Sequence, residues 1–126
     1  MSTNCWIARK TQKGYEVIYC HWDGYPERVG RILKQYYSDP KKLRKLFALG
    51  DISSLRKDIG KYHPFDYDID DPKYKNMTTA YHRDRGDPWP EVKPTLFKSF
   101  VALLDKRGPS ISYLYVFEKG KWTQVK

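Results

Sequence analysis

The sequence contains few cysteines, fewer acidic than basic residues, and no long hydrophobic run. Its 126 residues include two cysteines, Cys5 and Cys20, which are too few for a disulfide framework or a four-cysteine zinc site. No window approaches the roughly 18 apolar residues that a membrane-spanning helix requires. The start of the chain, MSTNCWIARK, holds no apolar run of signal-peptide length. We therefore expect a soluble protein of the cytoplasm that has no membrane partner.

Complete catalytic and metal-binding motifs are also missing. Residues 82–84 (His-Arg-Asp) resemble a kinase catalytic loop, but Trp89 stands where Asn is needed, and there is no glycine-rich phosphate loop. The Asp-rich run 66–70 begins like a calcium loop, but Asp71 and Met77 replace its required Gly and Glu. No zinc or RNA-binding fingerprint is present. We expect no cofactor and no metal, and we favour a protein that is not an enzyme.

The composition predicts one folded domain over residues 1–126. Aromatic residues make up 16% and hydrophobic residues 40% of the chain, which is enough for a packed core. Disordered chains lack such bulky apolar groups.

Two strands, 4–10 and 15–21, are predicted around a turn at Thr11–Gly14. Opposed positions then sum to 25, which places Arg9 opposite Glu16 and Cys5 opposite Cys20. We favour two buried free thiols for the cysteines, and a redox pair is the alternative.

Helices are predicted in the middle of the chain. Pro26 and Glu27 suit the first turn of a helix that runs to about Tyr37. A second helix starts after Ser38 or Asp39 and ends at Gly50, and a short third helix, capped by Asp51 or Ser53, runs to Ile59. A long surface loop follows from Lys61 to Lys75.

The last third of the chain predicts a strand, a helix and a hairpin. The strand covers 78–83, and prolines exclude regular structure until a helix opens near Thr95. The inner stripe of that helix is expected to contain Phe97, Phe100, Val101 and Leu104. Residues 111–118 and 121–125 form the hairpin, with Phe117 opposite Trp122. The fold class is therefore α+β, with an antiparallel sheet of four to five strands from the two terminal hairpins and three to four helices.

Basic residues are in excess and are unevenly distributed. There are 24 Lys and Arg against 15 Asp and Glu, and the formal net charge is +9. The excess is concentrated between Arg28 and Lys61, and such a field attracts polyanions. The natural partners are nucleic acid, a nucleotide or an acidic protein surface, and the alternative is a merely solubilising face. The candidate binding residues are Arg28, Arg31, Lys34, Lys41, Lys42, Arg44 and Lys45.

Two polar clusters suggest an alternative activity. His21 and Asp23 lie at a predicted strand end, and the second cluster is His82, Arg83, Asp84 and Arg85. If the clusters meet, they would form a small phosphodiester hydrolase, with Arg neutralising the phosphate charge. The structural alternative is a turn at Asp23 and an Arg–Asp network that holds the long loop.

The stretches YCHWDGYP, LGDISSL and YHRDRG, in that order, resemble a family of small uncharacterised proteins of bacteriophages and prophages. The resemblance implies a setting and no mechanism: a phage accessory gene acting in the cytoplasm of a bacterial host. Small phage proteins of this kind often block host defence or redirect host nucleic-acid machinery by binding. The expected function is therefore a non-enzymatic counter-defence or host-takeover factor whose basic surface binds nucleic acid, a nucleotide or a nucleic-acid-handling host protein complex. A purely protein-directed inhibitor is a further alternative. The oligomeric state is left open.

Overall fold

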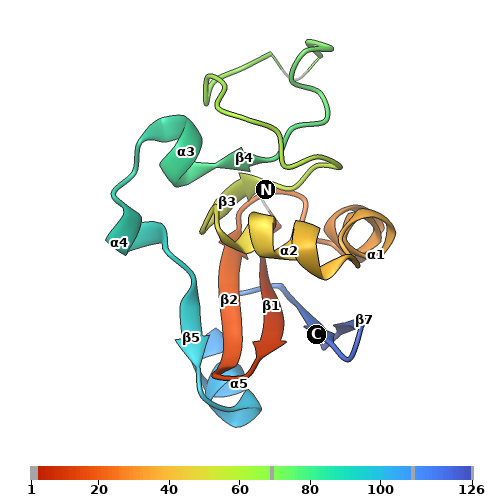
Figure 1. Cartoon of the computed structure of the whole chain (residues 1–126), viewed down its shortest axis with the longest axis vertical. Coiled ribbons are helices and arrows are strands. Elements are labelled where there is room, and N and C mark those ends of the chain that lie inside the picture. Colours follow the sequence, from red (N-terminus) through yellow and green to blue (C-terminus); the bar gives the residue numbers. More distant parts are fainter. Residues whose placement is uncertain (1–2, 69, 109, 126) are drawn as a thin grey trace.

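The chain folds around one mixed β-sheet, flanked by helices on both of its faces (Figure 1). A computed structural model describes residues 3–68, 70–108 and 110–125. In this part of the chain seven strands form the sheet, in the order β4-β3-β2-β1-β6-β7, with β5 beside β2. The predicted α+β class is confirmed, and the sheet is larger than expected.

The N-terminal hairpin has the predicted register. Strands β1 (Cys5–Thr11) and β2 (Gly14–Cys20) are antiparallel, with Arg9 opposite Glu16 and Cys5 opposite Cys20. The Arg9 guanidinium contacts the Glu16 carboxylate at 2.7 Å. Both cysteines are buried free thiols, and burial raises the pKa of the Cys5 thiol well above its usual value.

The C-terminal hairpin joins the first one through a parallel pair of strands. Strands β6 (Tyr113–Glu118) and β7 (Lys121–Gln124) place Phe117 opposite Trp122, as predicted. Strand β6 then runs parallel to β1, with Cys5 opposite Tyr113. The prediction of an antiparallel sheet is therefore wrong at this central pair, because each hairpin reveals its own register but not which edges of two hairpins will meet.

The other edge of β2 is shared by two short strands. Strand β3 (Ile52–Ser54) pairs with the C-terminal end of β2, at Cys20. Strand β5 (Thr95–Phe97) pairs with the N-terminal half of β2. Strand β4 (Thr79–Ala80) adds outside β3. The predicted third helix is wrong, because Ile52 is fully buried in the sheet and tertiary pairing overrides the local capping signal.

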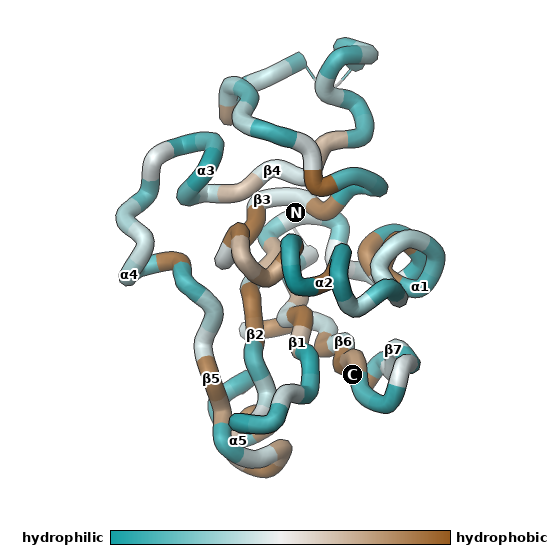
Figure 2. The backbone as a smooth tube through the Cα atoms, in the orientation of Figure 1, coloured by the Kyte–Doolittle hydropathy of each residue, from teal (hydrophilic) through white to brown (hydrophobic). Residues whose placement is uncertain are grey.

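The first two helices predicted after the hairpin are confirmed, and they cover one face of the sheet. Residues Pro26–Gly30 form a π-helical turn, η1, which continues into α1 (Arg31–Tyr36). Helix α2 (Pro40–Phe47) is capped at its N-terminus by Asp39, whose carboxylate accepts the Lys41 N–H at 3.1 Å. The outward side of α2 is hydrophilic, whereas β1 and β2 contain both hydrophobic and hydrophilic stretches along their length (Figure 2).

The opposite face of the sheet is covered by α5 (Phe100–Arg107). Neighbouring residues of one strand point to opposite faces, so Ile7 packs with α1 and α2 while Ala8 packs against Leu103 of α5. The inner stripe predicted for this helix is only partly right. Phe97 and Phe100 pack against the core of this face, but Val101 is 75% exposed and Leu104 38%, and the fully buried residue of the helix is Leu103. The helix starts later than expected, at the Ser99 cap, because residues up to Phe97 belong to β5.

The long loop is confirmed, and the segment after it is more regular than predicted. The described residues between 61 and 76 form turns but no helix or strand. The expected strand 78–83 is only β4, after which α3 (Tyr81–Arg85) begins. Helix α4 (Trp89–Val92) interrupts the Pro-rich stretch, because a proline in a first helical turn loses no hydrogen bond.

Candidate polyanion-binding site

Basic side chains from three separate segments line one groove of about 250 Å³, which we call the basic groove. Five of its lining residues are cationic, and the others include one aromatic ring and one amide. The lining residues are Arg28, Arg31, Ile32, Tyr36, Arg56, Lys57, Lys75 and Asn76. The groove therefore gathers charges that are far apart in the sequence.

The π-helical turn presents the first two cations. The Arg31 N–H donates to the carbonyl oxygen of Pro26, five residues earlier, which is the hydrogen bond of a π-helix. The Arg31 side chain is fixed in part by its Nε, which donates to the Glu27 carbonyl at 3.2 Å. Such turns are frequent at functional sites, and this one places Arg28 and Arg31 at the same groove.

Arg56 is held in place through its backbone. Its N–H donates to the Thr78 hydroxyl oxygen at 3.0 Å, and its carbonyl accepts the Tyr37 hydroxyl at 2.6 Å. Tyr37 is fully buried, and desolvation raises its pKa to about 12, so the hydroxyl stays protonated and able to donate. The Arg56 side chain therefore extends from a fixed position.

The groove carries excess positive charge. Among the described residues, no carboxylate lies within 4.0 Å of the side-chain nitrogens of Arg31, Arg56, Lys57 or Lys75. Arg28 has a weak contact, 3.9 Å from Asp23. Its Nε atom is buried without a hydrogen-bond partner in the described part of the chain. Arginine matches phosphate geometry with two parallel donors, so the three arginines of the groove suit an oxyanion.

Lys42 reinforces the rim of the groove. Its Nζ donates to the carbonyl oxygen of Lys57 at 2.7 Å and lies 4.4 Å from the ring centre of Tyr37. The Lys57 ammonium group lies 5.8 Å from the ring centre of Tyr36. These contacts fix the first turn of α2 to the segment that follows β3, and Tyr36 remains part of the groove lining.

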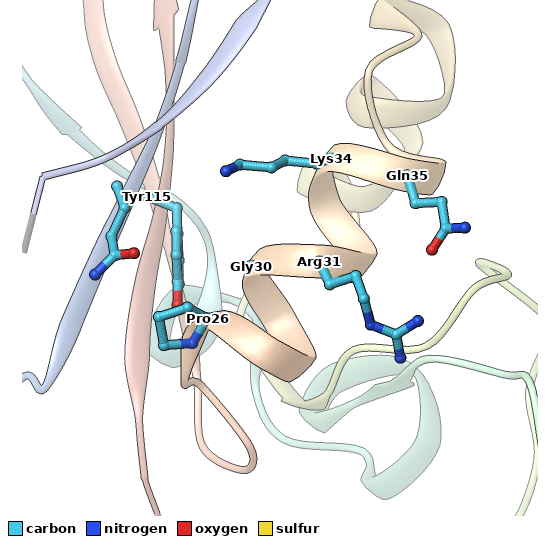
Figure 3. A pocket seen from close by; sticks show the side chains of 7 residues that line it. Pro26, Gly30, Arg31, Lys34, Gln35 and Tyr115 are labelled. Carbon is cyan, nitrogen blue, oxygen red and sulfur yellow. The ribbon is translucent and has the colours of Figure 1, made fainter.

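A second cavity shares the lining residue Arg31 with the basic groove. This helix–strand cleft, of about 480 Å³, lies between η1, α1 and the C-terminal hairpin. Figure 3 shows Lys34 extending toward the strand that carries Tyr115, while Arg31 and Gln35 point to the other side of the helix. The Tyr115 hydroxyl is not free for a ligand, because it donates to the Gly24 carbonyl at 2.7 Å.

The structure does not bring the sequence-predicted binding residues together at one place. Arg28 and Arg31 line the groove, Lys34 lines the cleft, and Lys42 lies at the groove rim. The other three predicted residues are exposed on α2 and line neither cavity; they are Lys41, Arg44 and Lys45.

Sequence reasoning missed three of the groove cations. Arg56 and Lys57 contribute to the charge excess before Lys61, but the helix expected there gave no reason to place them beside Arg28. Lys75 lies in the loop that has no periodic pattern, so only the tertiary structure brings it to the groove.

The cluster at residues 82–85 is mainly structural. The Asp84 side chain is fully buried and accepts hydrogen bonds from the N–H of Ala80 (2.8 Å) and of His63 (3.3 Å). Arg83 contacts Asp84 at 2.9 Å and donates to the carbonyl oxygens of Ile59 and Thr78. These contacts join the two ends of the long loop. They form the Arg–Asp network that the sequence analysis gave as the alternative to a hydrolytic site.

His63 is a buried polar residue that sequence reasoning did not identify. Its Nδ1 lies 2.9 Å from the Lys61 carbonyl oxygen, and its Nε2 lies 3.1 Å from the Thr79 hydroxyl. The ring stacks on Tyr74 and meets the edge of Tyr67. The loop thus has a small core of its own, which no local sequence pattern predicted.

The remaining residues of the two clusters have separate local partners. The Nδ1 of His21 lies 2.7 Å from the Tyr19 hydroxyl, and that of His82 lies 2.7 Å from the Asp87 carbonyl oxygen. Arg85 pairs with Asp87 at 2.7 Å. In the described residues no hydrogen bond or ion pair joins residues 21–23 to residues 82–85. The arrangement therefore resembles two local networks more than one assembled hydrolytic centre.

The groove and its neighbouring cavities define a candidate polyanion-binding site on an α+β domain. Comparisons with protein-family models, with curated proteins and with solved structures find no match to the chain. No helix of the described segments has the length and apolar character needed to cross a bilayer.

Proposed function

We propose that the chain binds nucleic acid through phosphate contacts in the basic groove. The observation that carries the proposal is the convergence of five cationic side chains from separate segments, four of which have no carboxylate partner among the described residues. A solubilising surface needs dispersed charge, whereas cations gathered in a concave site favour an anion with several charges. A nucleic-acid backbone has this property, and phosphate contacts supply most of the affinity in such complexes.

The resemblance to phage proteins gives this activity a setting. In that setting we propose an accessory protein that acts by binding in the bacterial cytoplasm, as a counter-defence or host-takeover factor. Binding is favoured over hydrolysis because Arg83 and Asp84 are engaged in holding the loop ends.

The test is fluorescence anisotropy with labelled single-stranded and duplex oligonucleotides at 50 and 200 mM salt. Arg31→Glu/Lys57→Glu changes the groove, and Lys13→Glu/Lys106→Glu makes the same charge change at the β1–β2 turn and on α5. We expect the groove variant to lose affinity by about 100-fold and its salt slope to fall by about two, because each lost phosphate contact removes about one counterion. The control variant is expected to change affinity by about twofold.

Two results would overturn the proposal: no salt-sensitive binding to any nucleic acid, or equal losses in the groove and control variants. The same mixtures, incubated with Mg²⁺ or Mn²⁺ and resolved on a gel, are expected to contain intact nucleic acid. Cleavage that stops in His21→Ala or His82→Ala would instead support the hydrolase.

A further inference from the structure

A third cavity, lined by aromatic rings and carboxylates, adjoins the basic groove. It has a volume of about 460 Å³, and we call it the aromatic pocket. Its rings come from Trp22, which follows β2, and from Phe65 and Tyr67 of the long loop. Asp23 and Asp66 supply the carboxylates. Trp22 is 46% exposed, so a ligand can reach the indole ring.

Two residues connect the aromatic pocket with the basic groove. Arg56 lines both cavities, and its backbone is held by Thr78 and Tyr37. Asp23 of the pocket lies 3.9 Å from Arg28 of the groove. The two cavities are therefore neighbours, and a ligand anchored on Arg56 can enter both of them.

The two cavities have opposite chemical preferences. The groove, with its unpaired cations, suits a phosphate, while the carboxylates of the pocket would repel one. Aromatic rings stack on the flat face of a nucleobase, and a carboxylate oxygen accepts a hydrogen bond from an exocyclic amino group. A nucleotide joins these two parts within one molecule, with its phosphate and base at opposite ends.

We propose that the aromatic pocket takes an unstacked, amino-bearing base of the strand whose phosphate lies in the basic groove. The partner is then single-stranded nucleic acid, because a base inside a duplex is stacked and its amino group is paired. Cytosine, adenine and guanine carry an exocyclic amino group that Asp23 or Asp66 can accept, and thymine and uracil lack it. This inference rests on the proposed function and specifies its substrate.

The experiment compares labelled dC12, dT12 and a mixed-sequence 12-base-pair duplex by anisotropy at 100 mM salt. The wild-type chain is expected to bind dC12 about tenfold more tightly than dT12, and the duplex more weakly than either. Asp66→Asn should make dC12 and dT12 nearly equal. Trp22→Ala should weaken both by about tenfold through the lost stacking. Asp105→Asn on the exposed side of α5 is the matched control and should change neither affinity.

The outcomes separate this inference from the proposed function. If dC12, dT12 and duplex bind equally and Asp66→Asn and Trp22→Ala have no effect, while Arg31→Glu/Lys57→Glu still abolishes binding, the base pocket is overturned and the phosphate groove remains. If no oligonucleotide binds, both are overturned. Trp22→Phe keeps a stacking ring and should retain most of the affinity, and a melting curve shows that each variant is folded.

Discussion

The carboxylate of Asp51 accepts a 2.9 Å hydrogen bond from the backbone N–H of Tyr19. This N–H lies on the edge of β2 between the residues that pair with β5 and the residue that pairs with β3, so no strand supplies its acceptor. A side chain thus replaces a strand for one hydrogen bond. Its partly buried position raises the pKa of Asp51 to about 6.

Stability should therefore depend on pH through Asp51. Because its folded pKa lies above the ordinary value, the folded state binds the proton more tightly, so the contribution is present below about pH 4 and is lost as the pH rises through 6. Asp51→Asn keeps an acceptor oxygen without the charge. We expect it to be more stable than the wild-type chain at pH 8 by on the order of 1 kcal/mol, and equal to it at pH 4. Thermal unfolding from pH 4 to 8 measures this difference, with Asp105→Asn as the control. If Asp51→Asn is less stable than the wild-type chain at pH 8, the raised pKa of Asp51 is contradicted.

Asp84 should be the carboxylate whose loss most destabilises the fold. Asp84→Asn replaces one acceptor oxygen with an amide, so Arg83 loses its charge partner and a backbone N–H is left unpaired. We expect a loss of about 3 kcal/mol in the free energy of unfolding, measured with urea. Asp87→Asn breaks the more exposed ion pair with Arg85 and should change stability little. If the free energy of unfolding falls as little in Asp84→Asn as in Asp87→Asn, the loop network does not stabilise the fold.

Thr78 should affect binding without any change in charge. Its hydroxyl accepts the Arg56 N–H at 3.0 Å and also lies 3.2 Å from the Arg56 carbonyl. Thr78→Val removes this support, so Arg56 is held less firmly between its two cavities. We expect a loss of about 1–2 kcal/mol in stability and a severalfold loss in affinity for single-stranded DNA, measured well below the melting temperature. Thr123→Val, on the exposed strand β7, is the control and should alter neither quantity. Unchanged affinity in Thr78→Val would show that Arg56 does not need the Thr78 hydroxyl to bind DNA.

The two thiols should be chemically silent in the folded chain. Cys5 and Cys20 are completely buried, and the raised pKa of Cys5 keeps it as the unreactive thiol. We expect no reaction with a thiol reagent at pH 8 under native conditions and reaction of both cysteines in denaturant. Fast labelling of the folded chain would mean that this end of the sheet opens readily.

The hairpins and first helices were predictable because their signals are local. The pair Arg9–Glu16 and the turn between them specify one register, and Asp39 followed by Pro40 specifies a helix start. The wrong predictions concern segments whose partners are distant in sequence. Ile52–Ser54 becomes a strand because it pairs with Cys20, and nothing within the segment contains that information.

In the candidate site, too, some residues could be assigned from the sequence and others depend on distant parts of the chain. The excess of positive charge was visible in the sequence, and Arg28 and Arg31 do line the groove. Lys75 could not be assigned, because its position depends on how a loop without periodicity returns to the sheet. Tyr15 and Tyr115 of the hairpins are buried in the core, whereas the accessible Trp22 lies just after a strand.

The parallel pairing of β1 with β6 also has a consequence for synthesis of the chain. The pair joins residues about a hundred positions apart, so the β1–β2 hairpin leaves the ribosome long before the strand that covers its outer edge. During that interval β1 presents unpaired backbone groups beside its apolar side chains, which is a template for association with other chains. A product released before β6 is made would keep that edge open, and aggregation of such fragments is the vulnerability that this topology creates.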